Sequence, residues 1–399
     1  MEELGVLYYV DSFPKLSETF ILNEIYELYQ RGYNVAVFAQ NNPEEDISHT
    51  EYRGINIPVY YVDTSCTSLH QLFSKKSIQM AKNTPISSVF SNLSLKQSTY
   101  NFFLGNECRK FIDSLDFDID IIHAHFASTT RIGGLLAARY HDIPCTVTAH
   151  AVEIFKNPNP DEIKFICDSM NHVIVPSKYN YRYLRDEIGI DNDITVVPAT
   201  TRIEKFEPSA SPVKNRLLTV ARLVEKKGCS YGIEAINDLV EKGYNLEYHI
   251  IGTGDREDLL RQQVQKYGIG DHVKFLGNVS DETLQKELND ASIFLLPCVI
   301  ADDGDRDAMP VVLKEAMASE TACVSTTVSA IPELITDGHD GLLVPQKQSE
   351  ELAAAIRQLL DKPQQRRRIA ENGRKTVHNK FDISGSVDTL TEIFNSVQV

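Results

Sequence analysis

Short runs of β-branched and aromatic residues alternate with helical segments along almost the whole chain. We expect the first strands at residues 4–10, 34–39, 55–62, 119–125, 145–150, 173–176 and 195–198. After a break, further strands are expected at residues 217–221, 246–252, 273–276, 292–296, 322–326 and 342–344. Helices are expected between them, for example at residues 17–31, 129–140, 229–242, 255–267 and 349–360. Near-continuous apolar strands separated by helices are typical of parallel sheets that are covered on both faces.

The break falls at residues 202–215, where prolines, serines and charges of alternating sign replace the apolar pattern. A chain of 399 residues is too long for one ordinary core. We therefore expect an α/β fold with two facing Rossmann-like domains, residues 1–205 and 206–383, and a cleft between them. Residues 384–399 predict a helix beyond the last strand, which we expect to pack across the domain boundary. Ligands of such sheets bind outside the carboxyl ends of the strands.

Composition narrows the class of protein. The chain is 42% hydrophobic and 24% charged, which is ordinary for a soluble globular protein. Its net charge of −16 disfavours nucleic acid as a partner. The seven cysteines form no CxxC pair, so we expect neither a disulfide framework nor a zinc site built on cysteine. An acidic start before a short apolar run does not resemble a secretory signal, and no apolar stretch is long enough to span a membrane. We expect a cytoplasmic location.

The segment ARLVEKKG, residues 221–228, begins where the first strand of the second half ends. Arg222 and Lys227 place two cations in a loop at the strand end, and Gly228 permits close approach of the backbone. A guanidinium fork and a compact ammonium group suit a diphosphate. The alternative is an exposed basic turn that caps the next helix, and spacing alone does not decide between the two.

An acidic loop and a helix start follow at residues 297–319. Asp307 lies in the loop and Glu315 on the helix that begins near Pro310, and the N-terminus of this helix favours an anion. A calcium-binding loop is rejected, because that pattern requires glycine and glutamate where the chain has Ala308 and Lys314. The other acidic residues of the loop are equally consistent with a solvated surface.

Histidines mark two successive strand ends in the first half: His123 and His125 in IIHAHF, and His150 in TVTAH. Alternation along a strand puts the first two on one side. Zinc would need a third ligand and a carboxylate, so no metal site is predicted. The segment IIGTGDRED has Gly252 and Gly254 but lacks the third glycine of a dinucleotide fingerprint, so NAD is not expected.

Taken together, these motifs resemble glycosyltransferase family 4, which has the GT-B fold. The motifs are ARLVEKKG, IGTGDREDLL, VKFLGNVS, the segment from Asp307 to EAMAS, AIPELITDGHDGLLVP and HAHF. SETFILNEI and DGDRDAMPVVLKEAMAS resemble the exopolysaccharide or colanic-acid branch of that family. The resemblance implies a retaining, metal-independent enzyme of the hexosyltransferase type. It implies transfer of a sugar from a UDP- or GDP-sugar to a glycan, lipid-linked or small-molecule acceptor, with no cofactor.

The resemblance also implies residue roles. Arg222 and Lys227 would hold the donor diphosphate, and Glu315 would accept hydrogen bonds from the ribose hydroxyls. His125 and His150 match the acceptor-side histidines, and Asp307 stands near the donor sugar, where the family has glutamate. The remaining donor-binding residues implied are Gly252, Met309 and Val311.

Several positions depart from the family pattern. Asp307 is one methylene shorter than glutamate, Ala308 replaces glycine, and Pro310 lacks an N–H group. These changes bear on the choice of donor and on the rate rather than on the fold. A sugar-nucleotide-binding protein without catalysis, and a sugar-nucleotide epimerase of the same fold, therefore remain alternatives.

Residues 64–106 contain no acidic residue, in a chain that has 56. They contain lysines and interleaved apolar side chains, namely Lys75, Lys76, Lys82, Lys96, Leu69, Leu72, Phe73, Ile78, Met80, Phe90, Phe102 and Phe103. One interpretation is peripheral contact with an anionic membrane at the inner face of the plasma membrane, near a polyprenyl-linked acceptor. The other is an insertion whose apolar residues pack against the domain.

Overall fold

The computed structural model describes residues 4–43, 50–63, 92–208 and 212–398. The chain divides into two compact units, which are described here one at a time. Unit 1 consists of Met1–Pro198 and Ser386–Val399, and unit 2 of Ala199–Gly385. The first crossing between the units therefore precedes the linker at residues 202–215, which belongs to unit 2.

Unit 1 contains a parallel sheet with the strand order β3-β2-β1-β4-β5-β6-β7. The predicted strands of this half are all present, although β3 is shorter than predicted. Their bounds are β1 Gly5–Ser12, β2 Asn34–Asn41, β3 Val59–Tyr61, β4 Ile121–His125, β5 Cys145–Thr148, β6 His172–Val175 and β7 Ile194–Val196. The central strands β1 and β4 are buried on both faces, which explains their continuous apolar sequence.

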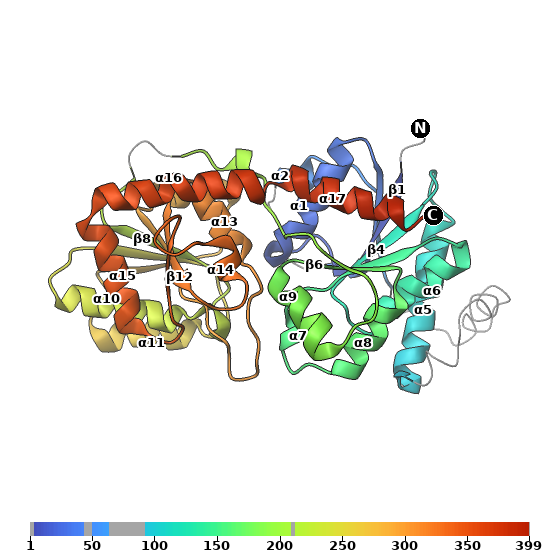
Figure 1. Ribbon diagram of the computed structural model, residues 1–399, viewed down its shortest axis with the longest axis horizontal. Coiled ribbons are helices and arrows are strands. Elements are labelled where there is room, and N and C mark those ends of the chain that lie inside the picture. The colour runs from blue at the N-terminus through green and yellow to red at the C-terminus, as the bar shows by residue number, and fades with distance from the viewer. Residues whose placement is uncertain (1–3, 44–49, 64–91, 209–211, 399) are drawn as a thin grey trace. The chain divides into compact units, whose positions relative to one another are not determined.

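Helices cover both faces of this sheet (Figure 1). The helices are α1 Thr19–Gln30, α2 Thr50–Arg53, α5 Leu95–Ile112, α6 Arg131–His141, α7 Val152–Phe155, α8 Pro160–Ser169, α9 Lys178–Arg182 and α17 Ile383–Ser396. Helices α5, α6 and α8 contribute to one core below the sheet, with Cys108, Leu135 and Ile166 buried in it. Helices α1 and α17 lie on the opposite face, where Ile25 and Phe394 are fully buried.

Helix α5 occupies part of the lysine-rich segment 64–106. For this segment the sequence left two interpretations open, contact with a membrane or an insertion packed against the domain. Ser94 caps the helix, and its side chain and that of Gln97 form a reciprocal capping box. Phe103 is buried and Phe102 packs against the core, so these two aromatic side chains are not available to a membrane. Residues 64–91 of the segment lie outside the described residues.

Unit 2 contains a second parallel sheet, with the order β10-β9-β8-β11-β12-β13. The strands are β8 Arg216–Val220, β9 Glu247–Ile251, β10 Val273–Gly277, β11 Ile293–Leu296, β12 Ala322–Thr326 and β13 Leu342–Val344. Each of them was predicted within two residues at either end. The helices are α10 Cys229–Glu241, α11 Glu257–Tyr267, α12 Asp281–Asp290, α13 Val311–Ala318, α14 Ile331–Leu334, α15 Ser349–Asp361 and α16 Pro363–Lys380.

Helices α10 and α11 lie on one face of the second sheet and α13 and α16 on the other (Figure 1). In both units the strand order changes direction beside the first strand of the unit, between β1 and β4 and between β8 and β11. Ligands of doubly wound folds bind at this switch point, outside the carboxyl ends of the strands. The loops after β4 and β8 are therefore the places to look for a site.

Candidate functional site

The loop after β8 carries the basic residues predicted for the second half. Arg222 is exposed directly after the strand, and Lys227 ends a short 3-10 turn before α10. Gly228 follows with a φ of 64°, and a Cβ atom at this position would lie 1.9 Å from the carbonyl oxygen of Pro297. Only glycine tolerates both this backbone conformation and this approach. Gly228 thus allows the loop after β8 to lie against the end of β11.

Lys227 and its neighbour Lys226 contact the acidic loop before α13. Lys227 Nζ lies 2.5 Å from Asp307 Oδ2. Lys226 Nζ lies 2.9 Å from Asp305 Oδ1 and 3.5 Å from Asp307 Oδ1. None of these four side chains is more than 14% exposed. Burial raises the pKa of Asp307, but Lys227, Lys226 and Arg222 lower it more strongly, to about 2. Asp307 is therefore an anion at neutral pH.

Arg222 is the third cation of the loop after β8. Lys226 and Lys227 pair with Asp305 and Asp307, whereas the side chain of Arg222 makes no hydrogen bond or ion pair with any residue that the structure describes. An exposed guanidinium next to two held lysines offers a bidentate fork and a positive field to a diphosphate. The basic loop is thus more than a helix cap, because its lysines reach across to a second loop.

Helix α13 begins behind the acidic loop, as expected from Pro310. Pro310 occupies the N-cap position without a side-chain hydrogen bond, and the first N–H groups of a helix have no partner within the helix. They favour an anion in front of them. Met309 is buried just before the helix and Val311 is half-buried at its first position. Glu315 is half-buried one turn further along.

Gly252 and Gly254 bring the loop after β9 against the loop after β8. A Cβ atom at Gly252 would lie 2.0 Å from the Ala221 carbonyl oxygen, and one at Gly254 would lie 2.4 Å from that of Leu223. Gly252 also has a φ of 117°. These two glycines therefore shape the loop that carries Arg222, which agrees with a tight turn rather than a dinucleotide fingerprint.

The histidines of the first half lie together at the carboxyl end of the unit 1 sheet. His125 ends β4 and His150 follows β5, and His125 Nδ1 lies 3.0 Å from His150 Nε2. The rings of His123 and His125 lie on one face of β4 with their centroids 4.8 Å apart. Burial lowers the pKa of His123 and of His125 to about 3, and that of His150 well below its usual value. All three imidazoles are therefore neutral at physiological pH.

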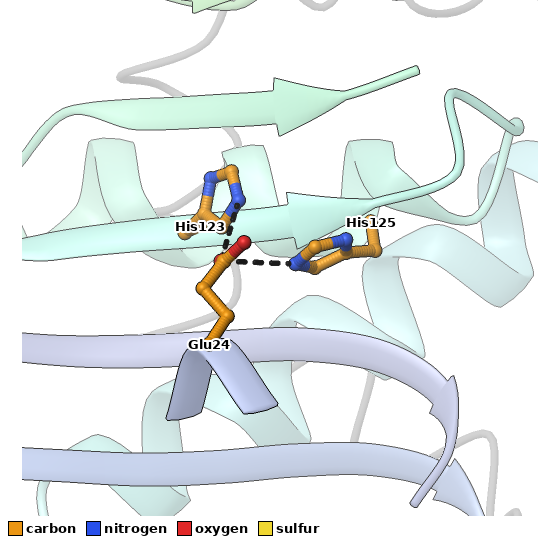
Figure 2. A group of neighbouring side chains, drawn as sticks. All are labelled: Glu24, His123 and His125. Carbon is orange, nitrogen blue, oxygen red and sulfur yellow. Dashed lines mark ion pairs between the residues drawn. The ribbon is translucent and has the colours of Figure 1, made fainter. Parts of the chain in front are cut away.

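Glu24 of α1 reaches this cluster, which sequence reasoning did not foresee (Figure 2). Glu24 Oε1 accepts a 2.6 Å hydrogen bond from the hydroxyl of Tyr8 on β1. The same oxygen lies 3.6 Å from His123 Nε2 and 3.5 Å from His125 Nε2. Burial raises the pKa of Glu24 and that of Tyr8. Among the described residues, Glu24, His123 and His125 form the one group whose ligand atoms converge as a metal ion would require.

Side chains of neighbouring residues hold the backbone at His125, the last residue of β4, and at His150. Arg131 is fully buried, donates from Nε to the carbonyl oxygen of His125 at 2.6 Å, and pairs with Asp11. The amide of His150 donates to Glu153, and Asn180 donates to the carbonyl oxygen of His150, each at 2.6 Å. These hydrogen bonds therefore hold in place the backbone that carries the His125 and His150 imidazoles.

Comparison with known proteins identifies the chain. The model described as Glycosyltransferase Family 4 matches residues 17–204, and that of Glycosyl transferases group 1 matches residues 200–376. A phosphatidyl-myo-inositol mannosyltransferase of Mycolicibacterium smegmatis is 30% identical over 70% of this chain and 72% of its own. The chain belongs to glycosyltransferase family 4. As a member of that family, it is a glycosyltransferase. The family and the GT-B fold that the sequence motifs predicted are confirmed.

Two further likenesses place this glycosyltransferase among its relatives. The WcaL protein of Escherichia coli K12, named as a colanic acid biosynthesis glycosyltransferase, is 27% identical over 88% of this chain and 90% of its own. The crystal structure of Anabaena HepE in complex with UDP and glucose superimposes with a TM-score of 0.75 at 17% identity. That superposition covers 99% of this chain and 100% of HepE, and it shows the fold. No helix in the described part of this chain is long and apolar enough to cross a bilayer.

Proposed function

We propose that this glycosyltransferase is a retaining enzyme of the hexosyltransferase type, which takes a sugar from a UDP- or GDP-sugar. The acceptor would be a glycan or a polyprenyl-linked sugar of polysaccharide biosynthesis. The observation that carries the proposal is the cluster of Lys226, Lys227 and Arg222 at the strand ends of unit 2. The relatives named for colanic acid and mannosyl transfer support the general class of acceptor.

In the proposed reaction, the bond from the anomeric carbon to the diphosphate oxygen breaks and the electron pair leaves with the diphosphate. Arg222, Lys227 and the first N–H groups of α13 stabilise the developing charge, which is electrostatic catalysis by groups already in place. The acceptor hydroxyl forms its new bond on the same face of the sugar, and its proton passes to the departing diphosphate. This route retains the anomeric configuration and uses no enzyme nucleophile.

Asp307 has a separate role in this proposal. Its carboxylate is held by Lys227 on one oxygen and by Lys226 on the other, so its direction is fixed. A fixed carboxylate accepts hydrogen bonds from sugar hydroxyls, whereas it repels a diphosphate. We infer that Asp307 orients the donor sugar. The nucleotide would bind against Glu315, Gly252, Met309 and Val311, and the acceptor would bind on the side of His125 and His150.

The test is a panel of UDP- and GDP-sugars, with release of the nucleoside diphosphate measured in the presence of chelator. The proposal expects release with one donor family, acceleration by a glycan acceptor, and an axial product from an axial donor by NMR. Transfer with inverted configuration would overturn the retaining mechanism. Binding of the nucleotide sugar without any release would favour the non-catalytic alternative, and conversion of the sugar itself would favour the epimerase.

A further inference from the structure

Three potential ligand atoms converge beneath helix α1 in unit 1. Glu24 Oε1 lies 3.6 Å from His123 Nε2 and 3.5 Å from His125 Nε2, and all three atoms lie within 4.8 Å of one another (Figure 2). These separations are longer than an ordinary N–H···O hydrogen bond of about 2.9–3.0 Å. The two distances from Glu24 Oε1 match the spacing of about 3.4 Å between ligands of a tetrahedral zinc ion, whose bonds measure about 2.0–2.1 Å.

One of these atoms is an orphan. His125 is 1% exposed, and its Nε2 atom has no hydrogen-bond partner among the described residues. A buried polar atom without a partner is rare in native proteins and calls for an explanation. This one faces a carboxylate oxygen at a distance that a small cation would fill. In the tautomer with the proton on Nδ1, the lone pair of Nε2 and the carboxylate would otherwise repel each other.

The outer nitrogens of both rings are already engaged. His123 Nδ1 lies 2.8 Å from Thr146 Oγ1, and His125 Nδ1 lies 3.0 Å from His150 Nε2. When Nδ1 carries the proton and donates outward, Nε2 is left with its lone pair toward Glu24. Histidines that bind metals are held in this way by a second partner on the other ring nitrogen. Thr148 Oγ1 lies 3.1 Å from His123 Nε2, and its hydroxyl would turn away when an ion binds.

Among the described residues, Glu24 makes its ion-pair contacts with the two histidines and has no lysine or arginine partner. Its side chain is only 18% exposed, and its Oε1 atom accepts the hydrogen bond from Tyr8. The nearby Arg131 pairs instead with Asp11. Removing a carboxylate from water is costly unless a cation balances it. A divalent ion would supply that balance and would tie α1 to β4.

We propose that Glu24, His123 and His125 bind a divalent transition metal, zinc in the first instance, with water as the fourth ligand. Two imidazoles and one carboxylate with an open position form a ligand set that zinc uses. The inference rests on the geometry of unit 1 and shares His125 with the acceptor side of the proposed function, so its test is zinc binding and not sugar transfer. Donor chemistry without a metal remains compatible with it, because the diphosphate is assigned to the cations of unit 2.

The experiment measures metal rather than activity. The full chain is purified without a histidine tag, stripped with chelator, and titrated with zinc sulfate by calorimetry and by the shift in melting temperature. We expect one zinc ion per chain and a higher melting temperature with zinc. Glu24→Gln keeps the shape of the side chain but removes its charge, and we expect it to weaken zinc binding at least tenfold. His125→Asn should do the same if the first variant folds poorly.

A matched control is available in unit 2. His249 is likewise buried, and its Nδ1 atom lies 2.7 Å from a carboxylate oxygen of Glu287. Within the described part of the chain, no second imidazole completes a metal-binding group with it. His249→Asn should leave zinc binding unchanged. A wild-type protein that takes up no zinc, or a folded Glu24→Gln variant that binds zinc as tightly as the wild type, would overturn the proposal. Loss of sugar transfer alone would not bear on it.

Discussion

Replacing Asp307 by asparagine separates the structural role of its charge from its role in donor binding. The carboxylate lies 2.5 Å from Lys227 Nζ and is 14% exposed. Its pKa falls from 3.8 to about 2, and each pKa unit corresponds to about 1.4 kcal/mol. The charged contacts therefore stabilise the folded state by about 2 kcal/mol at neutral pH. Asp307→Asn should lower the free energy of unfolding by about that amount.

The pH dependence has a definite sign. Because the folded state depresses the pKa, the stabilisation is fully present above the unfolded pKa near 3.8 and is lost as pH falls through about 2. Roughly half of the difference between wild type and variant should be gone at about pH 3. The chain has no tryptophan, so urea unfolding is followed by far-UV circular dichroism. Asp238→Asn, which breaks an exposed pair with Lys242, is the control and should cost about 0.5 kcal/mol or less.

For the same variant, Asp307→Asn, we expect binding of the nucleoside diphosphate to be kept or strengthened although the folded state is less stable. Asparagine removes a negative charge beside the proposed diphosphate site and releases Lys227 from its ion pair, whereas Lys226 keeps its pair with Asp305. Free UDP or GDP should therefore bind equally well or more tightly. Sugar transfer should fall, because the oriented carboxylate is lost. Weaker binding of the nucleoside diphosphate together with unchanged stability would refute the reasoning on both counts.

Four further outcomes are expected. Gly228→Ala should lower the free energy of unfolding by more than about 2 kcal/mol in urea titrations, because the new Cβ atom would meet the Pro297 carbonyl. Gly268→Ala is the control: Gly268 has a similar φ but open space around it, so the change should cost about 1 kcal/mol. Arg222→Ala should weaken diphosphate binding about tenfold by calorimetry, at about 1.5–3 kcal/mol for a charge-assisted hydrogen bond; equal affinity would exclude Arg222 from the site. Burial lowers the pKa of Lys314 to about 7, so the unfolded chain binds more protons and stability should rise between about pH 7 and 10, an increase that Lys314→Met should reduce. The membrane contact stays a prediction from sequence: sedimentation with anionic vesicles at low salt should be lost when Lys75, Lys76, Lys82 and Lys96 become glutamine.

The strands were predictable because parallel strands buried on both faces leave an unmistakable apolar run. β12 and β13 have the predicted bounds, and the histidines were placed correctly because alternation and strand order alone bring them to one sheet edge. Helix α5 was not predicted. It buries polar side chains, so its sequence does not show an apolar stripe. Arg109 donates to the side chain of Asn106, and Asn101 accepts from the backbone amide of Gly133.

The sequence could not predict which side chains from distant segments contact one another. In the sequence, Glu24 is one polar position on an amphipathic helix. Only the packing of α1 against β4 brings it to His123 and His125. Lys226 was not among the site residues predicted from the sequence, although it adjoins Lys227. The structure turns both lysines toward the acidic loop, and the adjacent pair KK was the signal that could have indicated this.

The central claim is that the cations after β8 stabilise the departing diphosphate. Its most direct test is kcat/KM for the best donor in the wild type, Lys227→Ala and Lys242→Ala. Both lysines pair with an aspartate, but Lys242 lies on the surface at the end of α10. The account predicts a fall of about tenfold to a hundredfold for Lys227→Ala and no more than about twofold for Lys242→Ala. Equal kcat/KM values for a folded Lys227→Ala protein and the wild type would contradict it.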